Sequence, residues 1–172
     1  MKRSILAAGF SLLALLSACS YHLVRDQARL PAAGIDSLSV PLARNQTIEA
    51  GLEDAFTQAL LERLRADGRV PLAPVGQAKA ELRCTLKALE VRNSSYNRTG
   101  REAAEQATVR AECRLVATDG GALIWTTGEI SASEQYPVGN DPMANESARA
   151  SALAEICRDL AETVRSLVLD SF

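Results

Sequence analysis

The sequence predicts an α+β fold, a two-layer sandwich in which two helices pack on one face of a four-stranded, mixed but mostly antiparallel sheet. Residues 49–66, and the stretch that follows Asp141-Pro142, carry apolar side chains at helical spacing. Residues 81–90, 106–117 and 124–132 alternate in character, as half-buried strands do. Two apolar helix faces and one apolar sheet face can then be buried together.

A short strand and an amphipathic helix are expected first. Residues 35–41 alternate apolar and polar side chains and stop at Pro41, which suits a short strand. Asn45 and Thr47 can cap a helix over residues 49–66, and Gly68 stands where a helix commonly ends. The apolar face of this helix contains Leu52, Phe56, Ala59, Leu60 and Leu64.

Three antiparallel strands are expected next. The polar stretch 93–105 is expected to form a long hairpin loop between the first two strands. Asp119-Gly120-Gly121 predicts a tight turn before the third. We expect the inner face of that third strand to carry Ile124, Thr126, Gly128, Ile130 and Ala132.

The final helix is expected to begin at Asp141-Pro142, a cap followed by a first helical residue. Its apolar stripe consists of Leu153, Ile156, Cys157, Leu160, Val164, Leu167 and Val168. We see no internal repeat, so residues 35–172 are expected to form a single domain.

The N-terminal segment is typical of an export signal. Lys2 and Arg3 precede an apolar run over residues 5–16, which is shorter than the roughly 20 residues that span a bilayer. Leu16-Ser17-Ala18-Cys19 resembles the lipobox of bacterial lipoproteins. We therefore expect a signal peptide over residues 1–18, lipidation of Cys19 and a tether over residues 19–34. An ordinary signal peptide with a chance cysteine is the alternative.

Composition and motifs favour a non-enzymatic protein. Removal of Lys2 and Arg3 with the signal leaves 17 basic residues against 21 acidic ones, so no general basic excess suggests nucleic-acid binding. His22 is the only histidine and lies in the tether, so it has no partners for a metal site or a catalytic triad. We expect no catalytic residue, no metal site and no cofactor.

Two cysteines are expected to face each other. If the first hairpin is centred between Arg98 and Thr99, Cys84 falls opposite Cys113 on the inner face. Directly opposed strand residues are about 4.5–5.5 Å apart at Cα, which permits a disulfide. Free buried thiols are the alternative, because cysteine is a good small core residue. Cys157 lies on a helix and is a poorer partner.

The outer face of the same sheet is expected to gather cations. The same register sets Arg83 opposite Arg114 and Lys87 opposite Arg110, and a two-residue turn at Gly120-Gly121 places Trp125 on this face. Opposed like charges are unfavourable on a sheet, which invites a functional explanation. A solvated face is the alternative; anion capture is the sharper hypothesis, since guanidinium groups match phosphate geometry.

Several segments resemble one known family. Cys19-Ser20-Tyr21-His22-Leu23 resembles the Cys-Gly-Tyr/Phe-His-Leu start of the lipopolysaccharide-assembly lipoproteins LptE, with Ser20 where glycine is usual. Residues 34–41 and Asn45-Gln46-Thr47 are similar to that family's first strand and helix start. The strand at 121–125, "GALIW", and the Ala-rich last helix also fit.

The resemblance implies an outer-membrane lipoprotein that plugs the LptD β-barrel, assists its assembly and binds lipopolysaccharide during delivery to the outer leaflet. On this interpretation Arg83, Lys87, Arg110, Arg114 and Trp125 are candidate contacts for the lipopolysaccharide. Ser20 rather than Asp after the lipidated cysteine also resembles outer-membrane sorting. A structural lipoprotein adaptor that binds a protein partner without lipid is the alternative. A thiol enzyme is a third, and it requires an exposed cysteine of low pKa.

Overall fold

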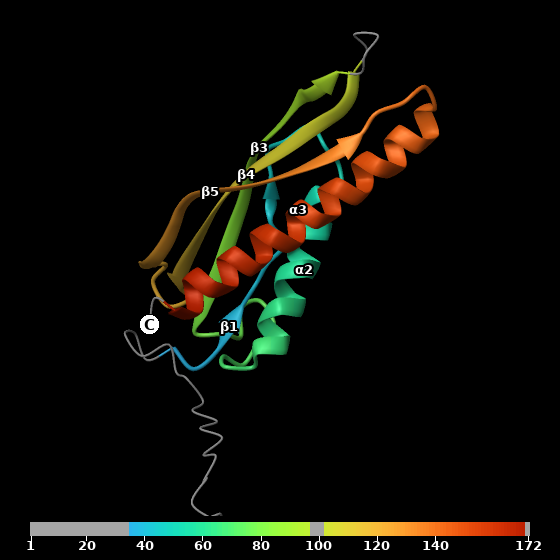
Figure 1. Cartoon of the computed structure of the whole chain (residues 1–172). Helices are drawn as coiled ribbons and strands as arrows, with labels where there is room; N and C mark the ends of the chain where they lie inside the picture. The colour runs from blue at the N-terminus through green and yellow to red at the C-terminus, as the bar shows by residue number, and fades with distance from the viewer. Residues whose placement is uncertain (1–34, 97–101, 171–172) are drawn as a thin grey trace, which may run out of the picture.

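The computed structural model describes residues 35–96 and 102–170 (Figure 1). The expected signal peptide at 1–18 and the expected tether at 19–34, with Cys19 and His22, lie outside these residues. The elements are, in order, β1 (Leu38–Ser39), β2 (Arg44–Asn45), α2 (Leu52–Asp67), β3 (Ala80–Tyr96), β4 (Glu102–Ala117), β5 (Leu123–Pro137) and α3 (Pro142–Asp170).

The sheet is mixed and mostly antiparallel, as predicted. β3, β4 and β5 form an antiparallel meander, and β1 and β2 both pair with β3 in parallel. β2 makes the sheet five-stranded rather than four-stranded. Figure 1 shows α2 and α3 side by side on one face of the sheet. The other face carries no helix among the described residues, so it is free to present polar side chains.

The helix α2 begins three residues later than its periodicity predicts. Asn45 Oδ1 accepts hydrogen bonds from the Thr47 N–H and hydroxyl, while Asn45 Nδ2 donates to the Glu49 carbonyl at 2.6 Å. These bonds fix a turn over residues 45–49 instead of capping a helix there. The helix starts after Gly51, and Gly68 ends it with φ 68° and an N–H bond to the Leu64 carbonyl, as predicted.

The first hairpin is longer than the sequence suggests, and the expected loop at 93–105 is wrong. Its two strands continue to Tyr96 and resume at Glu102. Asn93, Ser94 and Ser95 are exposed. These side chains face solvent, so no alternation of apolar and polar residues reveals this part of the strand in the sequence.

The predicted register of β3 and β4 is confirmed for the part of the hairpin that contains the two cysteines. Leu82 pairs with Leu115, Arg83 with Arg114 and Cys84 with Cys113. A bulge at Lys87 then shifts the ladder, so that Ala88 rather than Lys87 registers with Arg110. The expected pairing of Lys87 with Arg110 is therefore wrong, because the extra residue lies between them.

The strand β5 carries two bulges that the sequence analysis did not include. Glu112 pairs with Glu129 as expected, but Arg114 pairs with Thr126 and Leu115 with Trp125. Gly128, with φ 66°, lies in the first bulge, a position that favours glycine. Thr126 therefore lies on the outer face, where the sequence predicts an inner one.

The core lies between the sheet and the two helices. Its fully buried large side chains include Phe56 and Leu60 of α2, Leu82, Leu86 and Leu115 of the sheet, and Ile156, Leu160, Val164 and Val168 of α3. Leu167 departs from its predicted stripe, with 38% of its surface exposed. The helix α3 begins as predicted, with Asp141 Oδ1 accepting the Met143 N–H at 3.0 Å. Neither helix in the described part is long and apolar enough to span a membrane.

A candidate anion-binding face on the sheet

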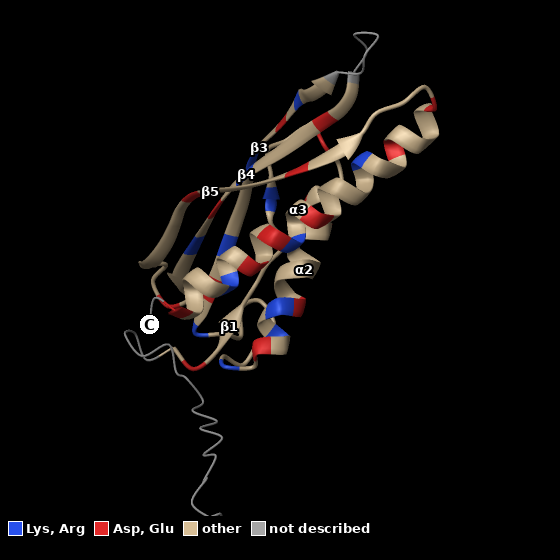
Figure 2. Ribbon diagram, viewed as in Figure 1, with Lys and Arg blue, Asp and Glu red and all other residues tan. Residues whose placement is uncertain are grey.

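The uncovered face of the sheet presents a group of cations that three neighbouring strands hold in register. Arg83, Lys87 and Arg114 lie on β3 and β4, and their side chains are exposed by 63%, 37% and 61%. Arg44 of β2 pairs with Thr85, which places it beside this group. Figure 2 shows blue bands on β2 and on neighbouring strands of the sheet.

These residues surround a hollow with a volume of about 510 Å³. Arg44, Arg83, Lys87 and Arg114 line it, together with the carboxylates of Glu81 and Glu112. Pro41 and Leu42 form an apolar part of its wall, and Leu42 is 59% exposed. The hollow therefore combines a formal surplus of two positive charges with an accessible apolar edge.

Carboxylates occupy only part of each cation's bonding capacity. Arg83 Nε lies 2.5 Å from Glu81, and Arg114 Nε lies 2.7 Å from Glu112. Lys87 also pairs with Glu112, and these two hydrogen bonds hold the pKa of Glu112 below its usual value. Glu112 is therefore ionised at neutral pH. For Arg44, no ion pair occurs within residues 35–96 and 102–170.

Of the predicted contacts, Arg83, Lys87 and Arg114 lie together. Arg110 lies away from the hollow and binds Glu90 at 2.5 Å. The bulge at Lys87 shifts the ladder by one residue, so Arg110 registers with Ala88 rather than with Lys87.

The assignment of Trp125 to this face is wrong. Trp125 pairs with Leu115, a fully buried residue of the inner face, and packs against the core. The bulge at Gly128 shifts the part of β5 that precedes it, including Trp125, by one residue, and a one-residue shift reverses the side on which a strand residue points. Gly128 within a strand pattern was the signal available in the sequence.

Arg44 is the cation of this hollow that the sequence analysis missed. It belongs to a two-residue strand, which is too short to show an alternating pattern. Its position depends on the parallel pairing of Arg44-Asn45 with Thr85-Leu86, supported by a 2.9 Å hydrogen bond from the Gln46 N–H to the Leu86 carbonyl.

The cysteines lie behind this face. Cys84 and Cys113 form a disulfide with an S–S distance of 2.03 Å, which is the pairing that the register indicated. Cys157 is a buried free thiol, and burial raises its pKa to about 11. A protonated, buried thiol does not meet the requirement of thiol catalysis. Within the described residues, no group of His, Cys, Asp or Glu side chains is arranged to hold a metal ion.

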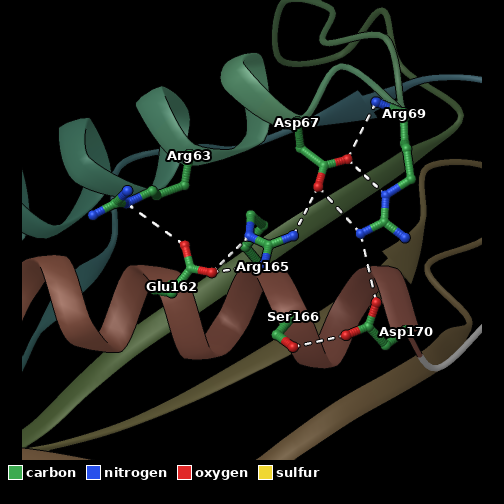
Figure 3. A network of polar contacts seen from close by, with 7 residues as sticks. All are labelled: Arg63, Asp67, Arg69, Glu162, Arg165, Ser166 and Asp170. Carbon is green, nitrogen blue, oxygen red and sulfur yellow. Dashed lines mark hydrogen bonds and ion pairs between the residues drawn. The ribbon is translucent and has the colours of Figure 1, made fainter.

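A second charged cluster links the C-terminal ends of α2 and α3 through ion pairs (Figure 3). Asp67 accepts from Arg69 at 2.7 Å and from Arg165 at 2.7 Å. The complete cluster has three arginines, three carboxylates and one hydroxyl, namely Arg63, Asp67, Arg69, Glu162, Arg165, Ser166 and Asp170. Its charges balance, so it lacks the positive surplus of the hollow.

Solved structures share this architecture. Rare lipoprotein B from Shewanella oneidensis is similar with a TM-score of 0.54 and 19% identity, covering 78% of this chain and 92% of that one. Lipoprotein B from Nitrosomonas europaea has a TM-score of 0.56 and 14% identity, covering 80% and 84%. A minor lipoprotein from Acinetobacter baumannii has a TM-score of 0.53 and 14% identity, covering 79% of this chain and 92% of that one. At these identities the likeness defines the fold alone, an α+β fold also found in bacterial lipoproteins.

A family match is more specific. The lipopolysaccharide-assembly family LptE matches residues 35–167, which include nearly all of the described domain. The chain belongs to this family, as its sequence motifs indicated. A search of curated proteins gave no match.

Proposed function

We propose that this protein is an outer-membrane lipoprotein that occupies the lumen of an LptD-type β-barrel, supports the assembly of that barrel and binds lipopolysaccharide during its delivery to the outer leaflet. The observation that carries this proposal is the family match over residues 35–167. The solved lipoproteins of the same fold support it. The protein acts by binding and turns over no substrate.

A pulldown from outer membranes tests the partner. The tagged full-length protein is purified in mild detergent, and an unrelated outer-membrane lipoprotein with the same tag is purified in parallel as the control. We expect an LptD-type barrel, recognised by its heat-modifiable migration and identified by mass spectrometry, only with the first protein. A soluble protein in place of the barrel would instead favour the structural adaptor.

The cationic group on the open sheet face is the proposed contact for lipopolysaccharide. Arg83, Lys87 and Arg114 lie within one hollow, and guanidinium groups bind phosphate with two hydrogen bonds at once. Arg110 lies outside the hollow, and Trp125 pairs on the inner face of the sheet, so neither is included in the proposed contact. An open face with a positive surplus suits the phosphate groups that lipopolysaccharide carries beside its acyl chains.

Charge reversal tests this contact. We expect Arg83→Glu with Arg114→Glu to weaken lipopolysaccharide binding while the helical CD spectrum and barrel association remain intact. The matched control is Arg92→Glu with Arg158→Glu, which makes the same charge change at exposed residues outside the hollow. Unchanged binding by the first variant, with the fold preserved, would exclude the face as a contact.

A further inference from the structure

The cations around the hollow differ in how they are engaged. Glu112 is shared by Lys87 and Arg114, and Glu81 binds Arg83. Both arginines donate to these carboxylates through Nε, and their terminal nitrogens make no hydrogen bond in the described part of the chain. Arg44 has no carboxylate partner there. The hollow therefore offers one unpaired cation and two partly free guanidinium groups.

We infer that this hollow is a binding site for a phosphate monoester in which Arg44 makes the principal contact and Glu112 competes with the ligand. Four cations against two carboxylates leave a surplus of two positive charges, which matches the near-dianionic charge of a phosphate monoester at neutral pH. The inference rests on the proposed function only for the source of the phosphate.

The position of Arg44 supports its role. Parallel pairing with β3 fixes Arg44 beside Thr85, on the face that carries Arg83 and Lys87 at two residues on either side. The Thr85 hydroxyl has no hydrogen-bond partner among the described residues and lines the same hollow. A phosphate can accept hydrogen bonds from both groups, because each of its oxygens is a strong acceptor.

The wall of the hollow indicates a phosphate attached to an apolar group. Pro41 and Leu42 line it directly before Arg44, and Leu42 is 59% exposed. An acyl chain beside the phosphate can cover Leu42, whereas inorganic phosphate cannot. Free phosphate and a lipid headgroup share the charge recognition, and Leu42 distinguishes them.

The test compares variants with opposite expected effects in the full-length protein in mild detergent. Arg44→Gln removes the unpaired cation and should weaken binding of phosphorylated lipopolysaccharide by about tenfold, the typical effect of losing a charged hydrogen bond. Glu112→Gln removes the carboxylate that pairs with Lys87 and Arg114, so it should strengthen binding of phosphorylated lipopolysaccharide. Arg92→Gln is the control, since Arg92 lies on β3 outside the hollow. Dephosphorylated lipopolysaccharide should bind weakly and respond to none of them.

Binding of inorganic phosphate, measured by ³¹P line broadening, tests the phosphate site independently of lipopolysaccharide. If Arg44→Gln abolishes this broadening, the phosphate site is supported even when lipopolysaccharide does not bind. In that case only the proposed function is contradicted. Leu42→Ser should weaken lipopolysaccharide binding and leave phosphate broadening unchanged. Lipopolysaccharide and phosphate binding that both survive Arg44→Gln, or a loss of affinity in Glu112→Gln with an unchanged melting temperature, would overturn the site.

Discussion

Single residues decide which groups of this protein are chemically available. Cys84 and Cys113 are bonded to each other, Cys157 is buried, and Glu112 is ionised between two cations. The parity of each strand places the disulfide toward the core and the cations toward the open face. Buried core side chains and exposed cations therefore occupy alternating positions of β3 and β4.

The disulfide can be checked by alkylation of the denatured, unreduced mature protein. We expect mass spectrometry to find label on Cys157 only, because Cys84 and Cys113 are bonded and Cys19 is proposed to carry lipid. Label on Cys84, Cys113 and Cys157 together would show that the bond is absent. Replacement of both bonded cysteines by alanine should lower the free energy of unfolding by about 3–4 kcal/mol, because the bond spans 29 residues.

The proposed anchor is tested at Cys19. We expect Cys19→Ala to abolish incorporation of radiolabelled palmitate and to leave a longer or mis-cleaved product that no longer fractionates with lipid. Two or more acyl chains give stable attachment, so loss of the lipidated residue should remove the anchor. The control is Cys157→Ala, which should label normally. Palmitate that persists in Cys19→Ala would contradict the lipobox assignment.

At the scale of elements, two devices place strands and helices. Bulges re-aim parts of β3 and β5, and the charged cluster of Figure 3 fastens the end of α2 to the end of α3. The bulge in β5 places Trp125 against the core. The charged cluster is centred on Asp67, whose side chain is only 13% exposed.

Gly128 carries the bulge in β5. A Cβ at this position would meet no atom within 4 Å, so Gly128→Ala tests backbone conformation alone. At φ 66° we expect a loss of about 1–2 kcal/mol in the free energy of unfolding, measured by urea titration. Gly139→Ala is the control, because Gly139 lacks a positive φ and its Cβ would make an ordinary contact. Equal effects of the two changes would contradict the conformational explanation.

The charged cluster should make stability depend on pH. Hydrogen bonds from Arg69 hold the pKa of Asp67 below its ordinary value of 3.8, so its contribution is complete above that value and declines as pH falls through the lower folded pKa. We expect Asp67→Asn to lose about 2 kcal/mol at pH 7. This deficit should shrink below about pH 4. Asp159→Asn, at an exposed position of the same face-to-face helix pair, should show neither effect. A deficit that is constant down to pH 2 would contradict this role for the carboxylate.

At the scale of the whole molecule, residue periodicity predicted the main helices and strands, but it did not predict short strands or bulges. Long amphipathic segments such as Leu52–Asp67 reveal helices directly, and the β3–β4 register followed from alternation. Two-residue strands have no period, so β2 and the contribution of Arg44 could not be predicted. The bulges change parity without changing composition, which explains the error at Trp125. The end of the β3–β4 hairpin near Tyr96 and Glu102 was also missed, because its exposed residues show no apolar alternation.

The fate of newly made lipopolysaccharide tests the central proposal most directly. The protein is depleted from its own bacterium, lipopolysaccharide is pulse-labelled, and its arrival in the outer leaflet is measured by accessibility at the cell surface. We expect labelled lipopolysaccharide to accumulate short of the surface and the folded LptD-type barrel to decline, with both restored by the wild-type chain. Undiminished arrival of lipopolysaccharide at the surface after complete depletion would contradict the proposed role in its assembly.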